Sequence, residues 1–348
     1  MSRLIKDILL AASAGLLTTV ASAQSNVLNL YSARHYQTDE ALYSQFTKAT
    51  GIKINRVDAD DAGILARLKA EGSASPADVI LLVDAARLGK GQTDGLFRPI
   101  KSPLLEAAVP AQLRAAAGPD GIAWFGLSTR ARVVVYDKTR VKREDVDTYE
   151  ELADPKTKGR VCLRSGSHPY NLSLFGSMLE HLGPAKMENW LQGLQANLAR
   201  APKGGDTDQI RAVASGECAV AISNSYYIAR LMRSTQAQDQ ALMGKVEVVF
   251  PNQQSWGTHL NIAGAAVARH SKNLPAAIQF IEYLASAQAQ TYFADGNNEW
   301  PVVASVKTAN PALQAMSGGA FKAETVPVAQ VAAHQVRVQQ MLDRIGFR

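Results

Sequence analysis

The chain has 348 residues, of which 47% are hydrophobic and 20% are charged. This length suits two domains better than one, and the composition excludes a disordered, collagenous or coiled-coil chain. The formal net charge is +6, but the lysines and arginines are scattered along the sequence. Because no basic run with interleaved aromatic residues occurs, we expect no nucleic-acid partner, whereas an anionic or otherwise charged small ligand fits this charge.

Residues 1–23 are typical of an export signal. Arg3 and Lys6 give a positive start, residues 8–20 are apolar, and Ala21–Ser22–Ala23 is a small-residue cleavage site. We expect cleavage after Ala23 and a soluble mature protein, with a buried N-terminal helix as the alternative. No later segment has about 18 continuous apolar residues, so no membrane span is predicted.

Strand and helix patterns then alternate along the first part of the chain. Thr38 is predicted to cap a helix that runs to Thr50 and stops at Gly51, and a second helix at 62–70 ends at Gly72. The predicted strands around these helices lie at 27–31, 52–57 and 78–83. This order predicts an α/β fold with a largely parallel sheet.

A second block of the same kind spans residues 161–250. Its predicted elements are strands at 161–163 and 218–222 and helices at 173–181 and 184–197. Long extended segments at 122–136 and 246–267 suit crossings between two lobes, and the tail is predicted to be helical at 274–293 and 325–345. We therefore expect two lobes, each a mostly parallel sheet flanked by helices, with a ligand cleft between them.

The two cysteines, Cys162 and Cys218, each lie in or beside a short apolar strand pattern. Neighbouring strands of one sheet could bring them within disulfide reach, and export would favour the bond. Two separate buried thiols are the alternative. Neither cysteine belongs to a CxxC pair or lies beside a candidate base, so nucleophilic catalysis is not expected.

Four of the ten tyrosines fall in loops that follow predicted strands: Tyr36, Tyr170, Tyr226 and Tyr227. The carboxyl ends of parallel strands are where α/β sheets collect ligands. Tyr36 also follows His35, and Tyr226 and Tyr227 are expected to open a helix. Arg230 is spaced to reach both rings of that pair.

Such a set of tyrosines suits a hard, highly charged cation. A free phenol has a pKa of about 10, but a cation such as Fe³⁺ can displace its proton and prefers oxygen ligands. The alternative is that each ring serves packing. No zinc-site spacing relates His35, His168 and His259. We interpret three aspartates as helix caps and solvated charges rather than calcium ligands: Asp58, Asp60 and Asp61. No hydrolytic carboxylate pair or serine elbow is present, so an enzyme is not expected.

The sequence resembles the exported ferric-ion-binding proteins of bacterial iron ABC transporters, in the type that combines a His-Tyr loop with a Tyr-Tyr pair. The resemblance covers nearly all of the mature chain and rests on motifs that include Leu30–Tyr36, Ser75–Val79, Ser223–Tyr227 and Asn261–Ala265. It implies the type II periplasmic-binding-protein fold with extended hinge crossings. It also implies residues 24–126 with 254–300 as one lobe and 127–253 with 301–348 as the other.

The same resemblance implies Tyr36, Tyr170, Tyr226 and Tyr227 as phenolate ligands of transported Fe³⁺, with Fe²⁺ possible. It makes His35 a fifth ligand and places Arg130 and Arg230 as cations around the ligands. A periplasmic monomer that delivers iron to an inner-membrane ABC permease is the implied function. A solute-binding protein for a phosphonate, thiamine or a polyamine is the alternative, with an extracytoplasmic enzyme as a more distant one.

Overall fold

The first lobe is built on three parallel strands, β1 (Val27–Ser32), β2 (Lys53–Asp58) and β3 (Val79–Leu82). The computed structural model describes residues 26–34 and 36–347 and orders these strands β2-β1-β3. Two helices connect them, α1 (Glu40–Thr50) and α2 (Asp61–Glu71). Every residue of β3 is buried, as expected for a strand that is covered on both faces.

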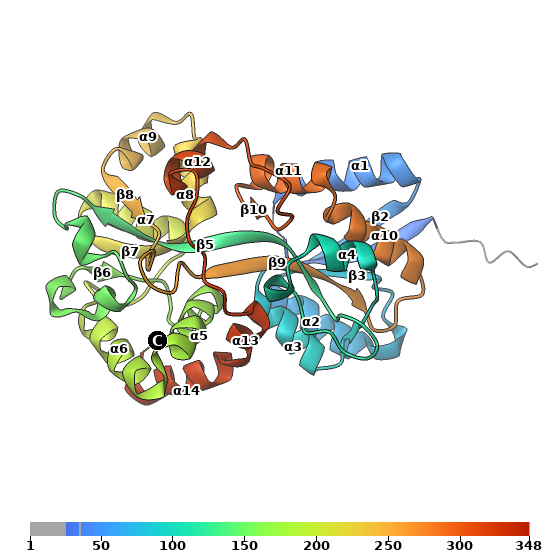
Figure 1. Cartoon of the computed structure of the whole chain (residues 1–348), viewed down its shortest axis with the longest axis horizontal. Coiled ribbons are helices and arrows are strands. Elements are labelled where there is room, and N and C mark those ends of the chain that lie inside the picture. The colour runs from blue at the N-terminus through green and yellow to red at the C-terminus, as the bar shows by residue number, and fades with distance from the viewer. Residues whose placement is uncertain (1–25, 35, 348) are drawn as a thin grey trace, which may run out of the picture.

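Two long strands cross between the lobes, β5 (Phe125–Asp137) and β9 (Leu260–Ala268) (Figure 1). β9 pairs antiparallel with β3, and β5 pairs antiparallel with β9 over its first half. Over its second half, β5 pairs with β7 (Val220–Asn224) and β8 (Val246–Val249) instead. One continuous strand therefore belongs to the sheets of both lobes.

The second lobe has one parallel strand pair, β6 (Val161–Cys162) beside β7. Its helices are α5 (Pro169–Leu182), α6 (Pro184–Ala196), α7 (Asp206–Ser215), α8 (Ser225–Met232) and α9 (Ala237–Met243). The sheets are mixed rather than mostly parallel, because both crossing strands run antiparallel to their neighbours. The two-lobed α/β architecture itself is confirmed.

The remaining helices pack around the sheets, and two short strands pair with β9 and β5. In the first lobe they are α3 (Ala85–Thr93), β4 (Phe97–Arg98), α4 (Pro103–Ala108), α10 (Leu274–Leu284), α11 (Ala287–Asn297) and β10 (Trp300–Pro301). The C-terminal part adds α12 (Pro311–Ser317), α13 (Val328–Ala333) and α14 (Gln335–Ile345). None of the helices within the described ranges has the length and apolar character needed to cross a membrane.

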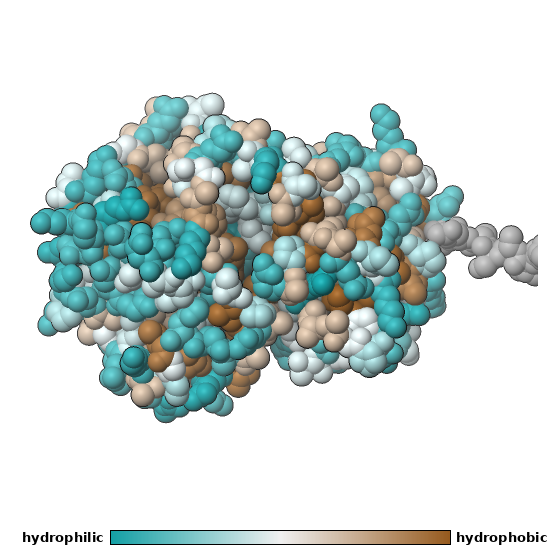
Figure 2. Space-filling model, in the orientation of Figure 1, coloured by the Kyte–Doolittle hydropathy of each residue, from teal (hydrophilic) through white to brown (hydrophobic). Residues whose placement is uncertain are grey.

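Each lobe buries its own apolar side chains. The first core gathers residues from β1, β3 and α10, whereas two adjoining clusters around β7, α5 and α6 fill the second lobe. Hydrophilic residues cover most of the visible face of the second lobe in Figure 2. Large exposed hydrophobic side chains in the described part of the chain are Leu104, Met232 and Val336.

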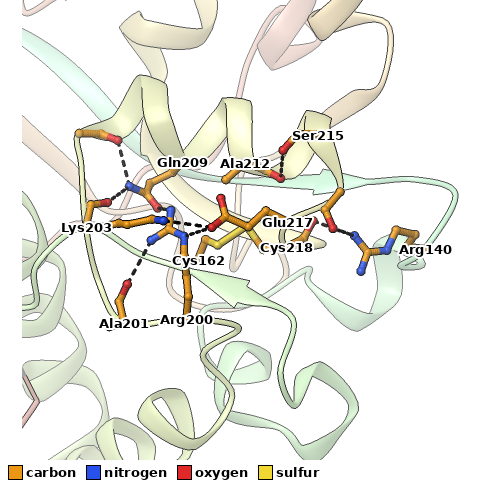
Figure 3. The surroundings of a disulfide bond; sticks show 12 residues. Arg140, Cys162, Arg200, Ala201, Lys203, Gln209, Ala212, Ser215, Glu217 and Cys218 are labelled. Atoms are coloured by element: carbon orange, nitrogen blue, oxygen red, sulfur yellow. Dashed lines mark hydrogen bonds and ion pairs between the residues drawn. A yellow bond between two sulfur atoms is a disulfide. The ribbon is translucent and has the colours of Figure 1, made fainter.

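The disulfide prediction is confirmed. Cys162 of β6 is bonded to Cys218, which precedes the adjacent strand β7, and their Cα atoms are 5.9 Å apart (Figure 3). Both side chains are fully buried. Arg140 donates to the carbonyl of Cys218 at 2.9 Å, which fixes the backbone beside the bond.

Some local predictions were wrong. Thr38 does not cap α1, because its hydroxyl bonds to Asn297 Oδ1 at 2.5 Å and a 3-10 turn at Gln37–Asp39 precedes the helix. The single helix predicted at 274–293 is two, since Ser286 caps α11 by accepting from the Ala289 amide. Helix α7 was not predicted at all.

Candidate metal centre

The four predicted tyrosines come together at the junction of the lobes. Tyr36 follows β1 of the first lobe, and Tyr170 lies in the first turn of α5. Tyr226 and Tyr227 lie in the first turn of α8, directly after β7. As expected, β1 and β7 deliver these rings at their carboxyl ends.

The rings are in mutual contact. The hydroxyl oxygens of Tyr170 and Tyr226 are 3.3 Å apart. The Tyr36 ring meets the Tyr226 ring edge to face at 6.1 Å between centroids, and the Tyr226 and Tyr227 centroids are 4.2 Å apart. Tyr170 and Tyr226 are buried, whereas Tyr36 and Tyr227 are half-buried. One ring from the first lobe and three from the second thus form a single cluster.

A cleft of about 460 Å³ opens beside this cluster, lined among others by Tyr36, Tyr170 and Asp61. Asp61 accepts from the Val83 amide at 2.8 Å, and burial raises the pKa of its carboxyl to about 6. Asp60 caps α2 as predicted, by accepting from the Gly63 amide. Solute can therefore reach Tyr36 and Tyr170 from this cleft. His35 lies outside the described residues, so its role as a ligand stays a prediction.

Arg130 is a buried cation beside the cluster. It lies on the crossing strand β5 with 1% of its surface exposed, and its guanidinium carbon is 5.7 Å from the centre of the Tyr170 ring. Among the described residues, its Nε and Nη2 have no hydrogen-bond partner. A buried cation with unused donors is costly unless negative charge is placed beside it. Glu299 Oε1, 3.8 Å from Arg130 Nη1, supplies part of that charge, and phenolate oxygens in the cluster would add to it.

The surroundings of the cluster favour neutral phenols. Burial raises the pKa of Tyr170 to about 12, with Arg130 opposing the shift. Burial also raises the pKa of Tyr226 well above its usual value, and the neighbouring tyrosines add to this effect. A bound cation must therefore displace the protons, as metals commonly do at their ligands. The described residues contain no group of three or more His, Cys, Asp or Glu side chains suited to a metal.

Arg230 lies on one side of the cluster. Its guanidinium carbon is 5.2 Å from the centre of the Tyr227 ring, and it donates to Thr207 Oγ1 at 3.2 Å. The sequence spacing led us to expect that its guanidinium would reach both rings of the pair. Tyr226 instead turns inward and is buried, while Arg230 is exposed on α8.

The sequence reasoning missed further charged residues at the site, among them Arg132, Arg164 and Glu299. Arg132 donates to Asn171 at 2.7 Å and pairs with Asp206, and its guanidinium lies 5.9 Å from the Tyr170 ring. The guanidinium of Arg164 lies 5.0 Å from the same ring. Alternation along a strand puts Arg132 on the same face as Arg130, so that signal was available. No local pattern marks Glu299.

A cleft between two lobes joined by two crossing strands, with candidate ligand side chains from both lobes, defines a two-lobed solute-binding protein. The model of the family described as bacterial extracellular solute-binding protein matches residues 41–318. The chain belongs to this family.

Similar proteins include several with iron in their names. Iron uptake protein A1 of Synechocystis is 43% identical over 321 residues, which cover 92% of this chain and 87% of that protein. The major ferric iron-binding protein of Neisseria meningitidis is 28% identical over 303 residues, 87% of each chain. A Trichodesmium structure in complex with iron and citrate ligands has a TM-score of 0.87 at 44% identity, covering 92% of this chain and 100% of that one.

Proposed function

We propose that this protein binds Fe³⁺ in the cleft between its lobes through the phenolates of Tyr36, Tyr170, Tyr226 and Tyr227, and delivers it to an ABC permease of the inner membrane. The observation that carries the proposal is the contiguous cluster of tyrosines around the buried, incompletely paired guanidinium of Arg130. The names of the similar iron uptake and ferric iron-binding proteins support it.

The charges balance for a trivalent ion. Four phenolates around Fe³⁺ carry one net negative charge, which Arg130 at the centre and Arg230 at the edge can offset. His35 precedes Tyr36 and is proposed as a fifth ligand. Fe²⁺ would bind more weakly to the same oxygens, because phenolate ligands favour the harder, more highly charged ion. Reduction is therefore one route to release.

Capture requires the two lobes to close. We propose residues 24–126 with 254–300 as the first lobe and 127–253 with 301–348 as the second. The separate hydrophobic cores support this division, apart from Leu127, Val302 and Val328, which pack into the first core. Bending at β5 and β9 would move Tyr36 away from the three tyrosines of the second lobe when the cleft opens and return it to them when the cleft closes.

The proposed place of action is the periplasm. Cleavage of the signal after Ala23 would leave a mature monomer that docks on its permease when closed. The family of extracellular solute-binding proteins and the disulfide between Cys162 and Cys218 support an oxidising compartment. We propose no catalytic activity.

Isothermal titration calorimetry tests the proposed ligand. Metal-free mature protein should bind Fe³⁺ supplied as ferric citrate, and should give no heat with a phosphonate, thiamine or spermidine. Citrate without iron serves as the blank. Binding of one of the organic ligands with no response to ferric citrate would overturn the proposal.

A further inference from the structure

A buried carboxylate, Glu299, lies against the first-lobe side of the tyrosine cluster with 1% of its surface exposed. It stands between α11 and β10, directly after Asn298, whose left-handed φ of 60° ends the helix. The next residue, Trp300, pairs with Thr129 of the crossing strand β5. The backbone on both sides of Glu299 is therefore fixed to the place where the lobes join.

The carboxylate of Glu299 divides its contacts between the crossing strand and Tyr36. Its Oε2 accepts from Ser128 Oγ at 2.8 Å and pairs with Arg34 Nη1 at 3.2 Å. Its Oε1 accepts from the Tyr36 hydroxyl at 3.3 Å and lies 3.8 Å from Arg130 Nη1. One side chain thus contacts a candidate metal ligand, the crossing strand and the buried arginine.

We propose that Glu299 is a positioning residue that holds the hydroxyl of Tyr36 in the metal-free protein and competes with the metal for that oxygen. The inference rests on the proposed function and deepens it by naming the group that favours release. Tyr36 is the tyrosine that the first lobe contributes, so it is the ligand that is withdrawn when the lobes separate.

The two arrangements exclude each other for a chemical reason. A carboxylate can only accept a hydrogen bond, so Glu299 stabilises Tyr36 as a phenol. Metal binding needs the phenolate, which would face the Glu299 carboxylate as a like charge unless it turned to the metal.

Glu299 also loses little when Tyr36 leaves it. Ser128 and Arg34 continue to satisfy its Oε2, and Oε1 is beside the guanidinium of Arg130, which has donors to spare. A group with a second set of partners can exchange a hydrogen bond without being left unsatisfied. The same carboxylate is therefore compatible with both the empty and the loaded site.

The test measures metal release in a double-mutant cycle. The wild type, Glu299→Gln, Tyr36→Phe and the double variant are loaded with Fe³⁺ and mixed with excess EDTA, and the visible absorbance is followed by stopped flow. Glu299→Gln should release iron about tenfold more slowly than the wild type, corresponding to about 1.4 kcal/mol. In the Tyr36→Phe background, Glu299→Gln should leave the rate unchanged, because the hydroxyl through which it acts is gone.

Two results would overturn the inference: release from Glu299→Gln at or above the wild-type rate, or an equal slowing in both backgrounds. The second would mean a general effect of the lost charge. Asp39→Asn is the matched control, because Asp39 is another buried carboxylate that pairs with Arg34, at 2.6 Å. It should release iron at the wild-type rate, and slowing equal to that of Glu299→Gln would likewise point to charge alone.

Removing one partner of a buried ion pair can prevent folding. Glu299→Asp then provides the test, because it keeps the charge for Arg34 and Arg130 and withdraws the oxygen from Tyr36. It should also slow release, and a wild-type rate would count against the inference. If the wild type itself shows no iron absorbance, the proposed function fails. If the wild type does and Glu299 has no effect, only this inference fails.

Discussion

The hydroxyl oxygens of Tyr170 and Tyr226 lie 3.3 Å apart, although the two residues are 56 positions apart in the chain. Two oxygens bound to one ion at about 2 Å each would be about 3 Å apart, so this spacing is close to that of two ligands of one ion. Strand β7 and the first turn of α5 set this spacing within a single lobe. The second lobe can therefore offer a partly formed site before the first lobe closes on it.

Tyr170→Phe should lower Fe³⁺ affinity by more than the roughly 10–100-fold that is typical of lost outer-sphere contacts, because it removes a proposed ligand. Competition with a chelator of known affinity measures the loss. Tyr283→Phe is the control, since the Tyr283 hydroxyl donates to the Leu42 carbonyl at 3.1 Å, away from the cluster. Equal affinities for the two variants would remove Tyr170 from the ligands.

Arg130→Gln should weaken Fe³⁺ binding by about 10–100-fold, since the phenolates lose the buried cation beside them. The same chelator competition applies. Arg56→Gln is matched in chemistry and also lines the cleft, but its side chain is 32% exposed and pairs with Asp58 at 2.8 Å. Its affinity should equal that of the wild type. Full affinity in Arg130→Gln would show that the central cation is dispensable.

Cys162→Ala with Cys218→Ala should lower the free energy of unfolding. The bond closes a loop with a sequence separation of 56, and loop-closure entropy of that size is worth about 4 kcal/mol. Urea unfolding of the wild type, with and without dithiothreitol, and of the double variant measures the effect. Iron binding at 25 °C should persist in the double variant, because the bond lies between β6 and β7 rather than in the cleft. Unchanged unfolding midpoints would mean that the bond does not constrain the unfolded chain.

Glu324, a buried carboxyl in the C-terminal segment, should make the free energy of unfolding depend on pH. Burial alone would raise the pKa of the Glu324 carboxyl. The charge of His259 and hydrogen bonds from His181 and Ser177 favour the ionised form, so the pKa is lowered to about 2 instead. A carboxyl with a depressed pKa stabilises the fold above its unfolded pKa of about 4.5, and this contribution is lost as the pH falls toward 2. We expect a loss on the order of 3 kcal/mol over that window, since each pKa unit is worth about 1.4 kcal/mol.

Urea unfolding between pH 6 and pH 2.5 checks this expectation. Glu324→Gln should be less stable at pH 6 and should show a flatter dependence on pH than the wild type. Asp343→Asn, a change at an exposed carboxyl on α14, is the control and should keep the wild-type slope. Identical slopes for Glu324→Gln and the wild type would place the acid sensitivity elsewhere in the chain.

Local patterns were enough to predict most of the elements that position the site. The alternation after residue 27 predicted β1 to β3 with their helices, and the Tyr226–Tyr227 pair does open a helix directly after a strand. These predictions succeeded because strand ends and helix starts depend on neighbouring residues. Predicting the disulfide needed one further step, the placement of two apolar strands side by side.

Long-range contacts explain the failures. Tyr36 and Glu299 are 263 positions apart, so nothing near either residue indicates that they meet. The hydroxyl of Thr38, expected to cap its own helix, is taken by Asn297, 259 positions away. Arg230 has the right spacing to reach Tyr226, but the Tyr226 ring is buried and Arg230 is exposed. Only the packing of the lobe determines that the Tyr226 ring is buried.

The visible spectrum of the Fe³⁺-loaded protein tests the central proposal most directly. Mature wild-type protein, titrated with ferric citrate, should develop a tyrosinate-to-iron charge-transfer band that saturates at one iron per chain. The band should be absent from the variant that combines Tyr226→Phe with Tyr227→Phe and remain in Tyr283→Phe. A wild type that stays colourless, or an unchanged band in the variant lacking both hydroxyls, would contradict the proposed centre.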